Sequence, residues 1–200
     1  MLFRCVFLYN FFFYSYFFSD INLLGNNIRD IMVLGGYMKK ISILALHLGY
    51  GGIEKSIVAL ANLLCDKYKV EIACTYKLYD KPVFDLDERV KVIYLMEEDK
   101  PNKAEFKRAL KKKKFITAFK EGIKSIKILR MRRKTMIDYI KNSKSKVIIS
   151  TRDIFNTWLG DYAKSGVLKI GWEHNHYHDD YRYARNVIRS AYYLDYFVLV

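Results

Sequence analysis

Two hydrophobic periodicities alternate along the chain from residue 38 onward. Short apolar runs, some with β-branched residues throughout, predict buried strands at residues 41–46, 69–75, 90–95, 146–150, 167–172 and 196–200. Apolar residues spaced three and four apart predict helices at residues 53–64, 155–164 and 182–193, and one or two more within 100–146. This alternation predicts an α/β fold, a mostly parallel sheet flanked by helices. Such sheets bind ligands beyond the carboxyl ends of their strands.

A glycine-rich turn separates the first strand from the first helix, with glycines at positions 49, 51 and 52. A strand, a turn and a helix N-terminus in this order direct backbone N–H groups and a positive helix dipole toward an anion such as a phosphate. The spacing is neither G-x-G-x-x-G nor a Walker loop. Two interpretations therefore stay open, a phosphate site and a turn that needs glycine only for its tight geometry. Glu54 is explained without a function, because the helix dipole favours a carboxylate in the first turn.

The composition is that of one ordinary domain. The chain has 200 residues, of which 52% are apolar and 16% aromatic, so a disordered chain is excluded. Cys5, Cys65 and Cys74 are odd in number and widely spaced, which argues against a disulfide framework or a zinc cluster and for reduced thiols in a cytosolic compartment. We expect Cys65 and Cys74 to be small core residues.

Residues 1–37 differ from the rest of the chain. The aromatic run at residues 6–18 is short for a membrane-spanning helix and contains Asn10, and no signal-peptide cleavage site follows it. Met38, directly before the first strand, resembles a natural start of translation. We interpret residues 1–37 as a hydrophobic extension upstream of the domain, with a membrane anchor as the second interpretation.

The segment Lys100–Lys146 carries the net charge. It contains 18 Lys and Arg against three acids, a balance of +15 in a chain whose total is +14. Apolar residues run through it at helical spacing: Phe106, Leu110, Phe115, Phe119, Ile123 and Ile126. A solvated helix face is one interpretation, and an amphipathic helix on an anionic membrane surface is another. Nucleic acid ranks third because no recognition motif accompanies the charge, and we predict no nucleic-acid partner.

Histidines and carboxylates crowd the stretch that follows the strand at 167–172. His174, His176 and His178 alternate there, with Asp179 and Asp180 beside them. Three histidines at every second residue fit a metal site only if the chain stays extended, whereas a loop is expected after a strand. A single functional histidine with solvated companions is the preferred interpretation, and no metal is predicted.

Four pieces of the chain together resemble the amino-terminal half of a glycosyltransferase of family 4. They are the first strand with GYGGIEKSIVALANLL (49–64), STRD (150–153), KIGWEHNHY (169–177) and YLDYFVLV (193–200), and they span residues 38–200. The resemblance implies a Rossmann-like domain, the acceptor-side half of a two-domain enzyme. Such enzymes transfer a sugar from a nucleotide-sugar donor to a glycan or lipid-linked acceptor with retention of configuration.

The resemblance also implies roles for individual residues. Gly51 and Gly52 would approach the donor diphosphate, and His174 would lie beside the reacting sugar as the catalytic histidine. Arg152, Glu173 and Asn175 would bind the acceptor. His176 and His178 match no family motif, and the family needs neither a metal nor a cofactor besides the donor substrate. We expect the glycine turn and His174 to open onto one crevice at the same rim of the sheet.

The resemblance extends only to the first domain of the family. The second domain, which carries most donor contacts, has no counterpart in the sequence, so we expect this polypeptide alone to bind donor weakly and turn over slowly or not at all. A cytoplasmic location, with peripheral contact to the inner face of the membrane through Lys100–Lys146, fits this picture. Two alternatives remain: a non-enzymatic Rossmann-like module that docks on a membrane or partner, and a flavodoxin-like nucleotide-binding protein that would not need His174.

Overall fold

A computed structural model of the chain describes residues 5–7, 39–97, 103–174 and 181–199. Within them, seven parallel strands form one sheet in the order β1-β7-β6-β5-β2-β3-β4. The strands are β1 (Cys5–Phe7), β2 (Lys40–Ala45), β3 (Lys69–Tyr76), β4 (Lys91–Met96), β5 (Val147–Ser150), β6 (Leu168–Glu173) and β7 (Tyr196–Leu199). The helices are α2 (Gly52–Leu64), α3 (Lys103–Lys111), α4 (Phe115–Asn142), α5 (Asp153–Tyr162) and α6 (Tyr181–Tyr193).

The strand order confirms the predicted α/β Rossmann-like fold. From β2 the chain adds β3 and β4 on one side, then returns to place β5, β6 and β7 on the other. Counted from β2, this is the order 3-2-1-4-5-6 of doubly wound dinucleotide-binding sheets. The predicted strands and helices match the observed ones to within about two residues at most ends, as expected for apolar runs of these lengths.

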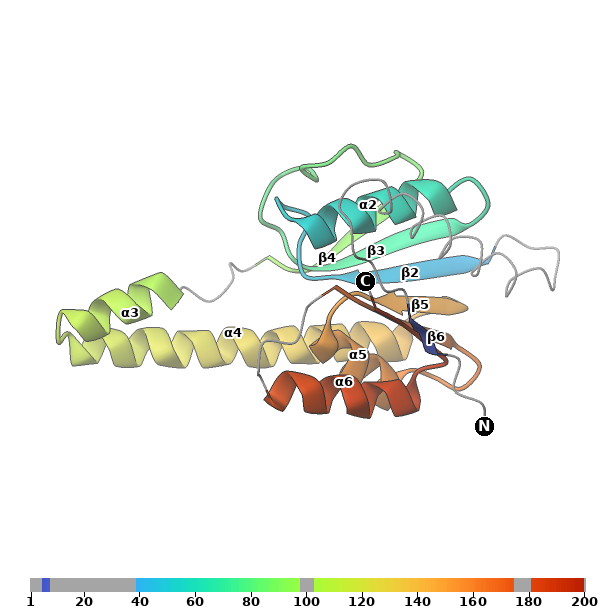
Figure 1. Ribbon diagram of the computed structural model, residues 1–200. Coiled ribbons are helices and arrows are strands. Elements are labelled where there is room, and N and C mark those ends of the chain that lie inside the picture. Colours follow the sequence, from blue (N-terminus) through green and yellow to red (C-terminus); the bar gives the residue numbers. More distant parts are fainter. Residues whose placement is uncertain (1–4, 8–38, 98–102, 175–180, 200) are drawn as a thin grey trace.

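Helices cover both faces of the sheet (Figure 1). On one face, Ile43 of β2 packs in the same cluster as Leu60 and Leu64 of α2. On the other face, Leu44 packs in one cluster with residues of α4 and α5, with Val187 of α6 and with Leu194 directly after it. Because neighbouring residues of a strand point to opposite faces, a strand apolar at successive positions is stable only between two helical layers.

Strand β3 is buried on both faces, although its sequence alternates. Glu71 occupies a polar position of that alternation and is nevertheless buried. The Lys40 ammonium lies 2.8 Å from its carboxylate, and the Tyr139 hydroxyl of α4 donates a 2.6 Å hydrogen bond to it. A charged group can be buried here because its oxygens are paired.

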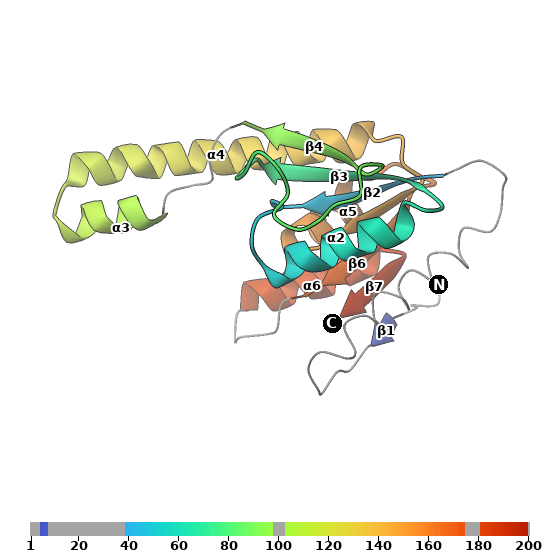
Figure 2. The ribbon, with the colours of Figure 1, turned by 90° about the horizontal axis from the view of Figure 1, so that it is seen from above.

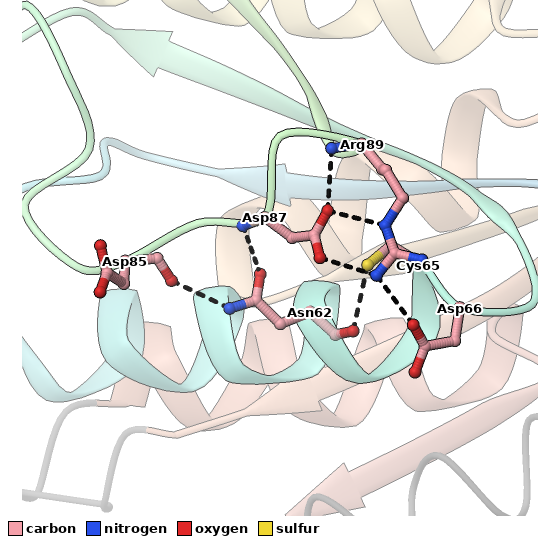
Figure 3. Close-up of polar contacts among 6 residues, drawn as sticks. All are labelled: Asn62, Cys65, Asp66, Asp85, Asp87 and Arg89. Carbon is pink, nitrogen blue, oxygen red and sulfur yellow. Dashed lines mark hydrogen bonds and ion pairs between the residues drawn. The ribbon is translucent and has the colours of Figure 1, made fainter.

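A polar cluster ties the loop between β3 and β4 to α2 (Figure 3). The Asn62 side chain donates to the carbonyl of Asp85 and accepts from the N–H of Asp87, both at 2.9 Å. Arg89 pairs with Asp87 and with Asp66 of the turn after α2. One side chain of α2 therefore fixes two backbone groups of a loop that has no strand or helix of its own.

Residues 5–7 add a short strand at the edge of the sheet. β1 pairs in parallel with β7, with Val6 opposite Val198. The rest of residues 1–37 lies outside the described residues, so the proposed boundary at residue 38 stays a prediction. Among the described helices, none has the length and apolarity needed to cross a bilayer.

The basic segment, for which one or two helices were predicted, forms two. The first half of α4 extends past the sheet, and α3 lies along it (Figure 2). The helical spacing of apolar residues in the sequence did not reveal which parts of these helices the sheet would cover. Phe115, Phe119 and Ile123, three of the residues that mark the amphipathic pattern, are exposed rather than packed on the sheet.

Candidate functional site

The reversal of strand order occurs between β2 and β5, the topological switch point of the sheet. Loops that leave adjacent parallel strands in opposite directions separate there, so the carboxyl ends of β2 and β5 flank the expected ligand site. The Thr151 hydroxyl donates a 2.8 Å hydrogen bond to the carbonyl of Leu44, which fixes the start of the β5 loop against the end of β2.

An ion pair crosses this switch point. Arg152 follows β5, and its Nη2 lies 3.0 Å from Oε1 of Glu54 in the first turn of α2. Glu54 is buried, whereas the Arg152 side chain is 23% exposed. Among the described residues, Nε of Arg152 has no hydrogen-bond partner. Arg152, the predicted acceptor-binding residue, is therefore held against the glycine turn by Glu54, and its Nε–H group can still donate a hydrogen bond.

Gly51 and Gly52 have different surroundings. A Cβ on Gly51 would collide with the Glu54 carboxylate, so this glycine makes room for the ion pair. A Cβ on Gly52 would meet nothing within 4 Å. Gly52 is also exposed at the first residue of α2, where backbone N–H groups lack intrahelical partners. The open space therefore lies in front of the anion-attracting end of the helix.

His47 lies beside the same turn. Its Nδ1 accepts a 3.2 Å hydrogen bond from the N–H of Gly49 and lies 3.5 Å from Oε1 of Glu54. An Nδ1 that accepts from Gly49 carries no proton, so an ion pair with Glu54 would require this bond to break. A Cβ on Gly49 would lie 2.9 Å from the ring of Tyr79, a side chain that is 48% exposed, so this ring would have to shift.

His174 lies at the carboxyl end of β6, on the side of the sheet occupied by Trp172. The two rings have centroids 4.3 Å apart, and Trp172 belongs to the cluster that packs under α2. Burial and the nearby Arg152 charge lower the pKa of His174 to about 4, so the imidazole is neutral at pH 7. Its Nε2 is removed from solvent and has no hydrogen-bond partner among the described residues.

Glu173 lies on the opposite face of the sheet from His174. It is fully buried, and its Oε2 accepts a 3.2 Å hydrogen bond from Nδ2 of Asn156 in α5. Burial, followed by the charges of Glu173 and Asp153, raises the pKa of Tyr183 to about 12. Strand alternation explains the separation, since residues 173 and 174 point to different faces.

Asn175, His176 and His178 lie outside the described residues, so their predicted roles are not placed. Within the described part of the chain, no group of three His, Cys, Asp or Glu side chains could hold a metal ion.

Cys65 and Cys74 are buried core residues, as predicted. Burial raises the pKa of Cys74 to about 12, which leaves a neutral thiol.

The structure thus brings together the turn at Gly51 and Gly52, Arg152 and His174 at one rim, and it separates Glu173 from them. The sequence reasoning missed His47 and the pairing of Glu54 with Arg152. Residues 54 and 152 lie 98 positions apart, and only the parallel pairing of β2 with β5 makes them neighbours. The signal that could have found them is their place in the segments that follow two apolar strands: His47 and Arg152 come directly after β2 and β5, and Glu54 lies in the first turn of the helix that follows β2.

No protein-family model matches this sequence, and comparison with curated proteins finds no match. The fold and the side chains at the rim therefore provide the basis for a functional proposal.

Proposed function

We propose that this rim is part of the sugar-transfer site of a retaining glycosyltransferase of the family 4 type. In this proposal a hexosyl group moves from a nucleotide-sugar donor to a glycan or lipid-linked acceptor, and the domain described here supplies the acceptor side. The observation that carries the proposal is the grouping of Gly52, Arg152 and His174 at the carboxyl ends of β2, β5 and β6.

The helix N-terminus can receive a diphosphate because the nearest carboxylate is compensated. Glu54 alone would repel a phosphate from the first turn of α2, but Arg152 lies 3.0 Å from it. The pair leaves the N–H groups of Gly51 and Gly52 beside a site without uncompensated negative charge. The space in front of Gly52 is open. Backbone donors at such a site bind phosphate oxygens without a metal ion.

The neutral imidazole of His174 suits hydrogen bonding to a sugar. A neutral ring has one nitrogen that donates and one that accepts, so it can orient a hydroxyl group at pH 7. A buried Nε2 without a partner costs about 1–3 kcal/mol, which a hydroxyl of the bound sugar would recover.

The proposal also includes contact between Lys100–Lys146 and an anionic membrane surface on the cytoplasmic side. Clustered Lys and Arg contribute about 1 kcal/mol each near an acidic leaflet. The competing proposal of a non-enzymatic module uses the same segment and predicts docking without sugar transfer.

Titration of the ¹⁵N-labelled chain with uridine and guanosine diphosphate sugars tests the site. We expect the amide signals of Gly51 and Gly52 to shift at millimolar donor, along with the imidazole signals of His174. In a His174→Ala variant with an unchanged fold, transfer activity of the full-length protein should be lost. Donor that shifts no rim signal would contradict the proposal. Donor binding that is unchanged in His174→Ala, together with no transfer activity in the wild type, would instead support a flavodoxin-like nucleotide-binding protein.

A further inference from the structure

Helix α4 has two halves with different surroundings. Its second half lies under the sheet, where Met136 and Ile140 are buried. Its first half leaves the sheet at Ile128 and continues into solvent with α3 beside it (Figures 1 and 2). We call residues 103–127 the arm. At 1.5 Å per residue, the α4 part of the arm extends about 20 Å beyond Ile128.

One side of the arm is apolar and uncovered. Its residues are each 51% to 76% exposed: Phe115, Ile116, Phe119, Ile123 and Ile126. Their spacing of three and four places them on one helix face, which we call the arm face. Helix α3 packs elsewhere, since Phe106 lies against Gly122 and Ala118 is buried. Isolated exposed apolar residues are ordinary, but five on one face mark an interaction site.

Cations border the arm face. Lys120, Lys124, Lys127 and Arg130 are exposed on the same helix, and residues 103–127 contain ten Lys and Arg against two acids. This combination selects among the surfaces that could cover the arm face. A second copy of the arm would bring like charges together, and a nucleic acid would satisfy the cations but leave two phenylalanines and three isoleucines in water.

We propose that the arm face inserts into an anionic lipid bilayer, at the boundary between head groups and acyl chains. A bilayer with acidic lipids offers both an apolar layer for the phenylalanines and negative charge for the bordering lysines. Basic charge alone would hold the segment above the surface, whereas the arm face requires penetration. The arm is then a monotopic membrane anchor with a defined orientation.

The arm begins at the same rim as the candidate site. Ile128, where α4 leaves the sheet, packs against Tyr76 and Met96, the last residues of β3 and β4. An inserted arm therefore holds the carboxyl ends of the strands within about 20 Å of the bilayer surface. Resting on the proposed sugar transfer, this placement assigns the acceptor to the lipid-linked class, with its reacting head group at the membrane interface.

Tryptophan fluorescence distinguishes insertion from surface attraction. The two native tryptophans, Trp158 and Trp172, are buried in the core. A Phe119→Trp variant should show a blue shift with vesicles of phosphatidylcholine and phosphatidylglycerol, and quenching when the acyl chains carry bromine. An Ile188→Trp variant on α6 provides the control and should show neither, since Ile188 is 60% exposed, against 70% for Phe119, but lies outside the arm. Vesicle binding without quenching at position 119 would overturn insertion.

Paired variants measure the contribution of each part of the arm. Phe115→Ser with Phe119→Ser should lower the vesicle partition coefficient at least about tenfold, whereas Tyr181→Ser with Ile188→Ser should not change it. Lys120→Gln with Lys124→Gln should weaken binding only to acidic vesicles, and Lys67→Gln with Lys164→Gln provides the matched control. A wild-type chain that sediments as a dimer dissociated by the double Ser change would indicate a second copy instead, and would also overturn the proposal.

The proposed sugar transfer and the proposed membrane insertion can be tested independently of each other. Donor titration without vesicles should shift the Gly51 and Gly52 amides equally in the wild type and in the Phe115→Ser, Phe119→Ser variant. Loss of vesicle binding with intact donor shifts would confirm that the arm and the rim are independent sites. Insertion without any donor shift would remove the lipid-linked acceptor assignment and leave the anchor.

Discussion

The Tyr139 hydroxyl donates a 2.6 Å hydrogen bond to the Glu71 carboxylate and so connects α4 to strand β3, which lies between β2 and β4. Burial alone would raise the pKa of Glu71, but the Lys40 ammonium and the Tyr139 hydroxyl outweigh it and lower that pKa. Ser42 extends the contact, since its hydroxyl lies 2.7 Å from that of Tyr139. The half of α4 beneath the sheet is therefore fixed by polar as well as apolar contacts.

A Tyr139→Phe substitution should lower the free energy of unfolding by about 1–3 kcal/mol. The change keeps the ring but removes a hydrogen bond to a buried charge, and it leaves Ser42 short of a partner. Urea denaturation measures the effect, and Tyr181→Phe, at an exposed tyrosine, provides the control. Equal stability of both variants would show that Lys40 and Lys91 compensate Glu71 without the tyrosine hydroxyl.

The two glycines of the turn should respond differently to alanine. Gly51→Ala should destabilise the protein and disturb the Glu54–Arg152 pair, because the new Cβ would collide with Glu54. Gly52→Ala should leave stability unchanged or raise it by up to about 1 kcal/mol, since alanine favours helix and nothing lies nearby. Thermal denaturation measures both effects.

Gly52→Ala also separates a functional glycine from a geometric one. If the space at Gly52 receives the donor diphosphate, the alanine methyl group should weaken nucleoside diphosphate binding although stability is retained. Ser56→Ala, in the second turn of the same helix, should leave binding unchanged. Equal donor affinity for Gly52→Ala and wild type would show that the open space is not the phosphate site.

His174 should make the protein less stable in mild acid. Its pKa is about 4 in the folded state and about 6.5 in the unfolded state, so between these values the unfolded chain binds more protons. Stability from the neutral ring is complete above pH 6.5 and declines as the pH falls toward 4, by on the order of 2–3 kcal/mol. Subtracting the pH profile of His174→Gln isolates this contribution. Identical profiles would show that His174 titrates normally.

Asn62→Ala should loosen the loop between β3 and β4 shown in Figure 3. The substitution removes hydrogen bonds to Asp85 and Asp87 and should cost about 1–3 kcal/mol. Hydrogen exchange should rise at the Asp87 amide, while the amides of β2 stay protected. Asn142→Ala provides the control, because Asn142 donates only to its own helix, at Asp138.

Local pattern predicted the elements of this fold but not their long-range contacts. Strands and helices follow from apolar spacing within one segment, so β2, α2 and the helical character of the basic segment were predicted, although the number of its helices was left at one or two. The pairing of Glu54 with Arg152 depends on which strands become neighbours, and that depends on the whole sheet. Helical spacing likewise predicts that Phe119 and Ile123 share a face, but it does not reveal that the sheet ends before reaching them.

The central position of β2 has a consequence for the order of folding. One edge of β2 pairs with β3, which follows soon after it, but the other edge must wait for β5. The contact from Thr151 to Leu44 spans 107 positions. During synthesis, β2 and β3 therefore emerge from the ribosome with an apolar strand edge open until α4 has been translated. Such an edge can pair with a strand of another chain. Slow translation of the segment from α4 to β5 would therefore favour aggregation.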